Sequence, residues 1–153
     1  MGKQKFKGIW LFGLSGVGKT YASLLINKYV KNSVLIDGDK VREYISTDLN
    51  YSKKHRNIQI KRLFGIGKIV KDSNCYPIIS SVWMNKIISD KLKDENIQLI
   101  KLKSEMKLIF KNHPTYKNKK DVVGKDINFA KFDCEEILNN RNNKFWIKLK
   151  KLI

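Results

Sequence analysis

The 153-residue sequence has little cysteine, few acidic residues and no long apolar run. Its two cysteines, Cys75 and Cys134, have neither CxxC nor metal-ligand spacing, so we expect reduced packing residues and not a metal or redox site. No apolar run reaches the roughly 18 residues that a membrane-spanning helix needs. The first five residues lack the apolar core of a signal peptide, and we therefore expect a cytoplasmic protein without a membrane partner.

Internal repeats and low-complexity linkers are also missing. A chain of this length favours one domain, residues 1–153, that is large enough to bury a core. Acidic residues number 14 against 32 lysines and arginines, which gives a formal net charge of +18. Such a charge attracts polyanions, but the lysines are spread along the chain as on a solvated surface. The net charge is therefore the only feature of the sequence that favours nucleic acid as a binding partner, and we do not expect such binding.

A phosphate-binding loop is the clearest feature that the sequence does contain. Residues 13–20 match the pattern GxxxxGK[ST] in full, between an apolar run at residues 8–12 and a helical pattern that begins at Tyr21. The glycines let successive N–H groups point at phosphate oxygens at the start of a helix. Lys19 is expected to reach the β- and γ-phosphates, and Thr20 to ligate magnesium (Mg²⁺). The predicted ATP-binding residues are Gly13, Leu14, Ser15, Gly16, Val17, Gly18, Lys19 and Thr20.

Strand-like and helix-like patterns alternate along the chain. Strands are expected at residues 6–12, 33–36, 77–82 and 97–102, and helices at 18–31, 40–46, 53–73 with Ser52 as N-cap, 84–94, and from Ser104 to about 111. This alternation predicts an α/β fold of the P-loop NTPase type, with a parallel sheet of about four to five strands and helices on both faces.

The last forty or so residues are less regular. Residues 113–130 show no sustained period, and we expect a lid-like loop over the site there. The piece from Asp133 is expected to form a closing helix, broken around Asn139 to Asn143.

Two carboxylates, Asp37 and Asp39, follow the second expected strand. The end of a parallel strand lies on the ligand side of an α/β sheet, so both should face the same crevice as the phosphate-binding loop. One carboxylate near Thr20 is expected to hold magnesium through water. The other is expected to accept a proton from a hydroxyl that attacks the γ-phosphate. A strand-end turn is the structural alternative for each aspartate.

In these motifs the sequence resembles the adenylyl-sulfate kinases (APS kinases) over roughly residues 8–130. That family carries GLSGAGKS, LDGDNVR and DLGFS, followed by an Arg and an IRR triplet. The chain is similar at residues 13–20, 35–42, 48–52, Arg56 and 60–62, and residues 120–126 look like a degenerate copy of the family's lid segment KGFTGID.

The resemblance implies an ATP-dependent phosphotransferase that phosphorylates the ribose 3′-hydroxyl of adenosine 5′-phosphosulfate. On matching positions, Asp39 would engage that hydroxyl, which leaves Asp37 for magnesium through water. Arg42 and Arg56 would bind the acceptor's anionic groups, and Tyr51 would stack on its base. Family members usually form homodimers. The acceptor-binding residues expected on this basis are Asp39, Arg42, Tyr51, Arg56, Gln59, Trp83 and Lys120, and Lys119 and Lys125 would approach the phosphates with Lys120.

Departures from the family cluster around the acceptor. Gln59 stands where the family usually has an Asn that contacts the acceptor, and Met84 stands where it has a Ser. A relative of the APS kinases phosphorylates cytidine diphosphoramidate in capsule biosynthesis, and Trp83 could fill the space that a purine leaves. The acceptor is therefore open between these two nucleotides. Two further hypotheses are a P-loop protein acting on nucleic acid, such as a polynucleotide kinase, and a kinase of another small metabolite.

Overall fold

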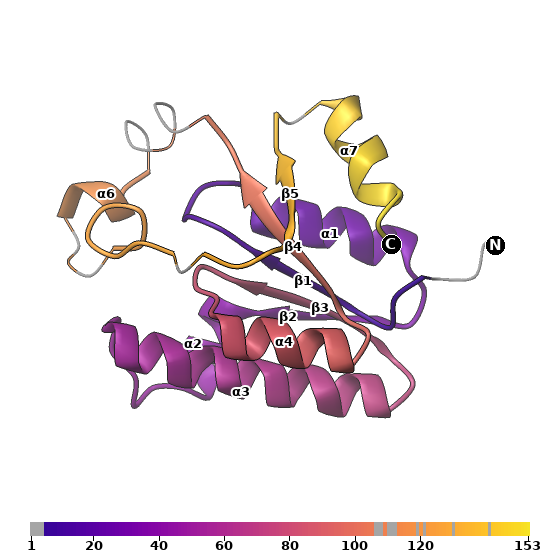
Figure 1. Ribbon diagram of the computed structural model, residues 1–153, viewed down its shortest axis with the longest axis horizontal. Helices are drawn as coiled ribbons and strands as arrows, with labels where there is room; N and C mark the ends of the chain where they lie inside the picture. The colour runs from indigo at the N-terminus through magenta and orange to yellow at the C-terminus, as the bar shows by residue number, and fades with distance from the viewer. Residues whose placement is uncertain are drawn as a thin grey trace.

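A five-stranded parallel sheet forms the centre of the computed structural model, which describes residues 5–105, 109, 113–118, 120, 122–129, 131–140 and 142–153, without the side chain of Asn118. The strand order is β2-β3-β1-β4-β5, and the predicted parallel sheet is thereby confirmed (Figure 1). The strands are β1 (Ile9–Phe12), β2 (Ser33–Asp37), β3 (Tyr76–Ser81), β4 (Gln98–Lys103) and β5 (Glu135–Leu138).

Helices connect the parallel strands, since each parallel pair needs a crossover. In Figure 1, α1 and α7 lie on one side of the sheet and α3 and α4 on the other. Within the described ranges, no helix combines the length and the apolarity needed to cross a membrane. The helices are α1 (Lys19–Tyr29), α2 (Gly38–Tyr44), α3 (Lys53–Asp72), α4 (Lys86–Asp94), α6 (Thr115–Asn118) and α7 (Asn143–Lys150).

The central strand β1 is buried along its whole length, because parallel strands in the middle of a sheet are covered on both faces. Its Trp10 donates the indole N–H to Ser81 Oγ at 2.8 Å, and Ser81 Oγ donates to the carbonyl of Trp83 at 2.7 Å. The indole N–H of Trp10 and the hydroxyl of Ser81, both buried in the core, thus have hydrogen-bond partners. The Gly13 N–H also donates to the Ser81 carbonyl at 3.3 Å. Together these hydrogen bonds fix the ends of β1 and β3 beside each other.

The long helix α3 begins where the sequence predicts. The hydroxyl of Ser52 accepts a hydrogen bond from the backbone N–H of His55 at 3.4 Å and caps the helix. Arg56, Ile60, Leu63 and Gly67 recur at intervals of three or four residues on its buried face. This face packs on β3 and carries Arg56 toward the carboxyl end of the sheet.

The prediction of a closing helix from Asp133 is wrong for the residues before Asn143. The chain instead forms β5, which pairs in parallel with β4, and α7 begins only at Asn143. On β5 only Ile137 is buried, so the apolar pattern is too sparse to indicate a strand. Pairing with β4 stabilises it, and Lys101 and Lys103 of that strand form ion pairs with Glu136.

The helix expected from Ser104 to about 111 falls mostly outside the described residues, as does Lys119. Within the segment expected to be a loop, α6 forms a single helical turn.

Candidate active site

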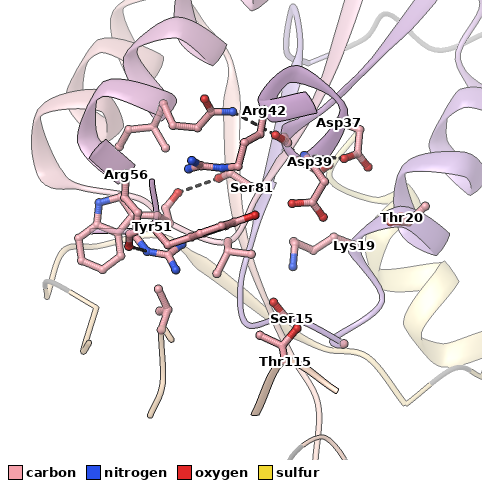
Figure 2. A pocket seen from close by; sticks show the side chains of 18 of the residues that line it. Ser15, Lys19, Thr20, Asp37, Asp39, Arg42, Tyr51, Arg56, Ser81 and Thr115 are labelled. Carbon is pink, nitrogen blue, oxygen red and sulfur yellow. Dashed lines mark hydrogen bonds between the residues drawn. The ribbon is translucent and has the colours of Figure 1, made fainter. Parts of the chain in front are cut away.

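A cavity of about 670 Å³ opens at the carboxyl ends of the central strands. The connection from β1 leads to β2 on one side of the sheet, whereas the connection from its neighbour β3 leads past β1 to β4 on the other side. Such a switch point is where parallel α/β sheets bind ligands. Five of the eight loop residues predicted to bind ATP line the cavity, together with both aspartates and all seven expected acceptor residues. In Figure 2 the labelled side chains among them, which include Lys19, Asp39 and Arg56, converge from separate elements.

The phosphate-binding loop joins β1 to α1 as the motif requires. Its backbone takes positive φ at Gly13 (152°), Gly16 (88°) and Gly18 (90°), a region that side chains disfavour. A Cβ atom on Gly13 would also collide with the Leu102 carbonyl. The cavity is lined by Ser15, Gly16, Gly18, Lys19 and Thr20, and not by Gly13, Leu14 and Val17.

Lys19 is a lining residue of the cavity. Its Nζ donates to the carbonyls of Gly13 and Leu14, each at 2.9 Å. Burial lowers the pKa of Lys19 to about 8, although the negative charges of Asp39 and Asp37 act in the opposite direction. In Figure 2 the Asp39 carboxylate points toward the ammonium group. The loop therefore holds a partly desolvated cation beside two carboxylates.

Asp37 and Asp39 hold different positions at the start of α2. Asp37 is the N-cap, and its Oδ1 accepts from the N–H of Asp39 at 2.8 Å and of Lys40 at 3.4 Å. One oxygen of Asp37 thus caps α2, which differs from the strand-end turn given as the structural alternative, and the residue also lines the cavity. Asp39 lies in the first turn of α2, which directs its carboxylate into the cavity.

Arg42, Tyr51 and Arg56 form a cluster on the wall opposite the loop (Figure 2). Both guanidinium groups form cation–π contacts with the Tyr51 ring. The distance from Cζ to the ring centroid is 4.6 Å for Arg42 and 5.5 Å for Arg56. Arg42 donates to the carbonyls of Leu49 and Asn50, and Arg56 donates to the Tyr51 carbonyl at 2.9 Å. The turn before α3 therefore holds two cations and one aromatic ring in fixed positions.

Gln59, Trp83 and Lys120 complete the acceptor side. Gln59 donates to the Gly38 carbonyl at 3.0 Å, and among the described residues its buried Oε1 has no hydrogen-bond partner. Trp83 is only 3% exposed: it donates to Asn57 Oδ1 at 2.8 Å, and its ring stacks on Phe129 at 6.0 Å. Lys120 reaches the cavity from the polar segment, whereas Lys125 does not line it.

Three residues at the site were not predicted from the sequence. Tyr116 donates to the carbonyl of Ser15 at 3.1 Å, and His113 lines the cavity beside the loop. Asn139, buried at the end of β5, donates to the Val17 carbonyl at 2.7 Å. Each is a single polar residue in an irregular stretch, and no local pattern connects it to a loop roughly a hundred residues away.

Comparison with known proteins agrees with this geometry. A family profile described as Adenylylsulphate kinase matches residues 5–124. An adenylyl-sulfate kinase of Vibrio parahaemolyticus is 28% identical over 143 residues, which cover 87% of the chain and 69% of that protein. The structure of a Mycobacterium tuberculosis APS kinase in complex with AMPPNP and APS shares the fold, with a TM-score of 0.76, 17% identity, and coverage of 97% of the chain and 99% of that protein.

The fold alone does not identify the acceptor. A sugar kinase from Janibacter sp. also resembles the structure, with a TM-score of 0.59 and 15% identity over 86% of the chain and 83% of that protein. The family profile is more specific, and it spans more than half of the chain. The chain therefore belongs to the adenylyl-sulfate kinase family, and it is an ATP-dependent kinase with a hydroxyl group as phosphoryl acceptor.

Proposed function

We propose that the chain transfers the γ-phosphoryl group of ATP to the ribose 3′-hydroxyl of a small anionic nucleotide, with adenosine 5′-phosphosulfate as the first candidate. The observation that carries this proposal is one cavity with the phosphate-binding loop on one wall and the Arg42, Tyr51 and Arg56 cluster on the other, with Asp39 in the same cavity. Such an arrangement can hold two anionic ligands close to one carboxylate.

The loop side suits the triphosphate of ATP. Backbone N–H groups of the loop and the start of α1 would bind phosphate oxygens, and Lys19 would exchange its bonds to the Gly13 and Leu14 carbonyls for the β- and γ-phosphates. No protein-only cluster of three or more His, Cys, Asp or Glu residues occurs in the described part of the chain. Magnesium often binds through nucleotide phosphates and few protein ligands, which fits Thr20 as a direct ligand and Asp37 through water. When bound, the ion would offset negative charge on the phosphates.

Asp39 is the group proposed to act on the acceptor. It would orient the 3′-hydroxyl and accept its proton as the oxygen bonds to the γ-phosphorus. The bond from that phosphorus to the oxygen it shares with the β-phosphate breaks, and ADP leaves with the bonding electron pair. Lys19, beside Asp39, would neutralise the charge that develops on the transferred group.

The other wall favours an anionic acceptor that also carries a hydrogen-bond donor. Two guanidinium groups favour an anionic acceptor over a neutral sugar, because their planar forks match the oxygens of phosphate-like groups. The buried Gln59 Oε1 similarly calls for an N–H or O–H group on the ligand. With Arg42 and Arg56 against the Tyr51 ring, an incoming base would have to pack on this cluster as a whole.

Cytidine diphosphoramidate is the second candidate, and the position of Trp83 favours it. The indole lines the cavity, donates to Asn57 and stacks on Phe129, and in this position it would restrict the space for a purine. The amide group of cytidine diphosphoramidate also supplies hydrogen-bond donors, which a sulfate lacks.

An acceptor panel tests the proposal. Purified protein with ATP and magnesium is assayed for ADP release with adenosine 5′-phosphosulfate, cytidine diphosphoramidate, a short oligonucleotide or a neutral sugar. We expect turnover with one of the two small nucleotides and none with the oligonucleotide or the sugar. Turnover of neither nucleotide would overturn the proposed acceptor class, and turnover of the oligonucleotide would favour a polynucleotide kinase.

A further inference from the structure

His113 lies against the phosphate-binding loop although it comes from a distant segment of the chain. It lines the same cavity, and a Cβ atom placed on Gly16 would approach its Cδ2 to 2.9 Å. The absence of a side chain at Gly16 therefore allows the imidazole edge to reach the loop backbone.

The hydrogen bonds of the ring indicate which nitrogen faces the loop as a donor. Nδ1 accepts a hydrogen bond from the backbone N–H of Thr115 at 3.4 Å. An accepting Nδ1 has no proton, so the proton of the neutral ring is on Nε2. Nε2 is bonded to Cδ2, the atom that lies against Gly16.

The surrounding segment is attached to the same loop. Tyr116 donates its hydroxyl to the Ser15 carbonyl at 3.1 Å, and its ring packs edge-to-face on the imidazole of His113 at 6.0 Å. The N–H of His113 bonds to the carbonyl of Ile109 at 3.0 Å. These contacts position the imidazole before any ligand binds.

We infer that His113 is a further nucleotide-binding residue, whose Nε2–H donates to a phosphate oxygen of ATP above Gly16. This inference rests on the proposed function, since it adds a side-chain donor to the backbone donors of the loop. The segment around α6 thus binds the triphosphate directly, in addition to lying over the cavity.

The test uses NMR of the histidine rings in the full chain. The sequence has two histidines, His55 and His113, so a His55→Gln variant assigns the ring signals. We expect the Nε2–H tautomer at His113 and, on adding AMPPNP with magnesium, a shifted and more slowly exchanging Nε2–H signal. Loop amides that shift while the His113 ring stays unchanged would overturn the inference and leave the proposed function intact. Loop amides that do not shift would overturn both.

Binding to variants separates a hydrogen bond from simple packing. His113→Ala should weaken AMPPNP binding about 10- to 100-fold, as expected for a lost hydrogen bond to a charged group. His113→Gln, which keeps an N–H donor of similar reach, should recover most of this loss. Lys117→Ala, on the exposed side of the same segment, is the matched control and should bind as the wild type. Equal losses in the Ala and Gln variants would contradict a donor role.

Discussion

At the scale of single residues, the site depends on which groups are charged and where they lie. Lys19, Asp37 and Asp39 could be predicted because the loop motif and the strand end fix their places in the chain. The sequence could not predict that Tyr51 contacts both arginines or that Gln59 Oε1 is buried without a partner among the described residues. Those features depend on how α2 and α3 pack, which no local pattern encodes.

Replacing Asp39 by Asn removes the proposed base and keeps the side-chain shape. We expect kcat to fall about 10²- to 10⁴-fold, with nucleotide affinity nearly unchanged. Steady-state kinetics and calorimetric titration with AMPPNP measure the two effects. A parallel loss of binding and turnover would instead indicate a structural role for Asp39.

The lowered pKa of Lys19 predicts that the protein takes up a proton when it binds a nucleotide at alkaline pH. The pKa of Lys19 is about 8 without a ligand, and phosphates should raise that pKa. Above about pH 8, ATP therefore binds with uptake of a proton, and its affinity falls as the pH rises further. Calorimetry at about pH 9, in two buffers of different ionisation enthalpy, measures the uptake, with about pH 7 as control. Buffer-independent heats at the higher pH would refute this assignment.

At the scale of elements, strands and helices with a dense apolar pattern could be predicted and β5 could not. β1 and β3 are apolar or small throughout, and α3 shows both its cap and its period. β5 presents two exposed glutamates and one buried residue, and it forms because β4 supplies hydrogen bonds and ion pairs. Asn139 directly follows β5 and donates to the Val17 carbonyl of the phosphate-binding loop. Because β5 could not be predicted, this contact could not be predicted either.

Two glycines of α3 provide a matched test of how this helix packs. Gly65 has open space where an added methyl group would lie, whereas a Cβ on Gly67 would collide with the Ile79 side chain of β3. Gly65→Ala should raise the free energy of unfolding by about 0.5–1 kcal/mol through helix propensity. Gly67→Ala gains the same propensity but overpacks the core at about 1–3 kcal/mol, so we expect a net loss. Urea unfolding compares them, and equal stabilisation of both variants would contradict this packing.

At the scale of the whole molecule, some of the basic residues behind the formal net charge of +18 have defined surroundings. Some lysines are paired: Lys68 and Lys71 with Glu95, Lys86 with Asp90, and Lys101 with Glu136. Lys19 and Lys120, with Arg42 and Arg56, surround the cavity that the proposal assigns to anionic nucleotides. The homodimer implied by the family stays a prediction.

Salt dependence distinguishes a cationic surface from a nucleic-acid site. We expect oligonucleotide binding to weaken steeply as salt rises to about 0.2 M, because its affinity comes from counterion release. Turnover of the small acceptor should change much less, since its anionic groups are enclosed. Fluorescence anisotropy at increasing salt measures the first effect. Oligonucleotide affinity that persists at about 0.2 M salt would support a nucleic-acid substrate.

The central claim is that the loop, Asp39 and the arginine wall together transfer a phosphoryl group to one defined hydroxyl. It is tested most directly by following the γ-phosphate of labelled ATP in a single turnover, with the acceptor identified in the panel and with its 3′-deoxy analogue. The account predicts label on the 3′-oxygen of the intact acceptor and no transfer to the analogue. Transfer to the 3′-deoxy compound, or label at any other position, would contradict it.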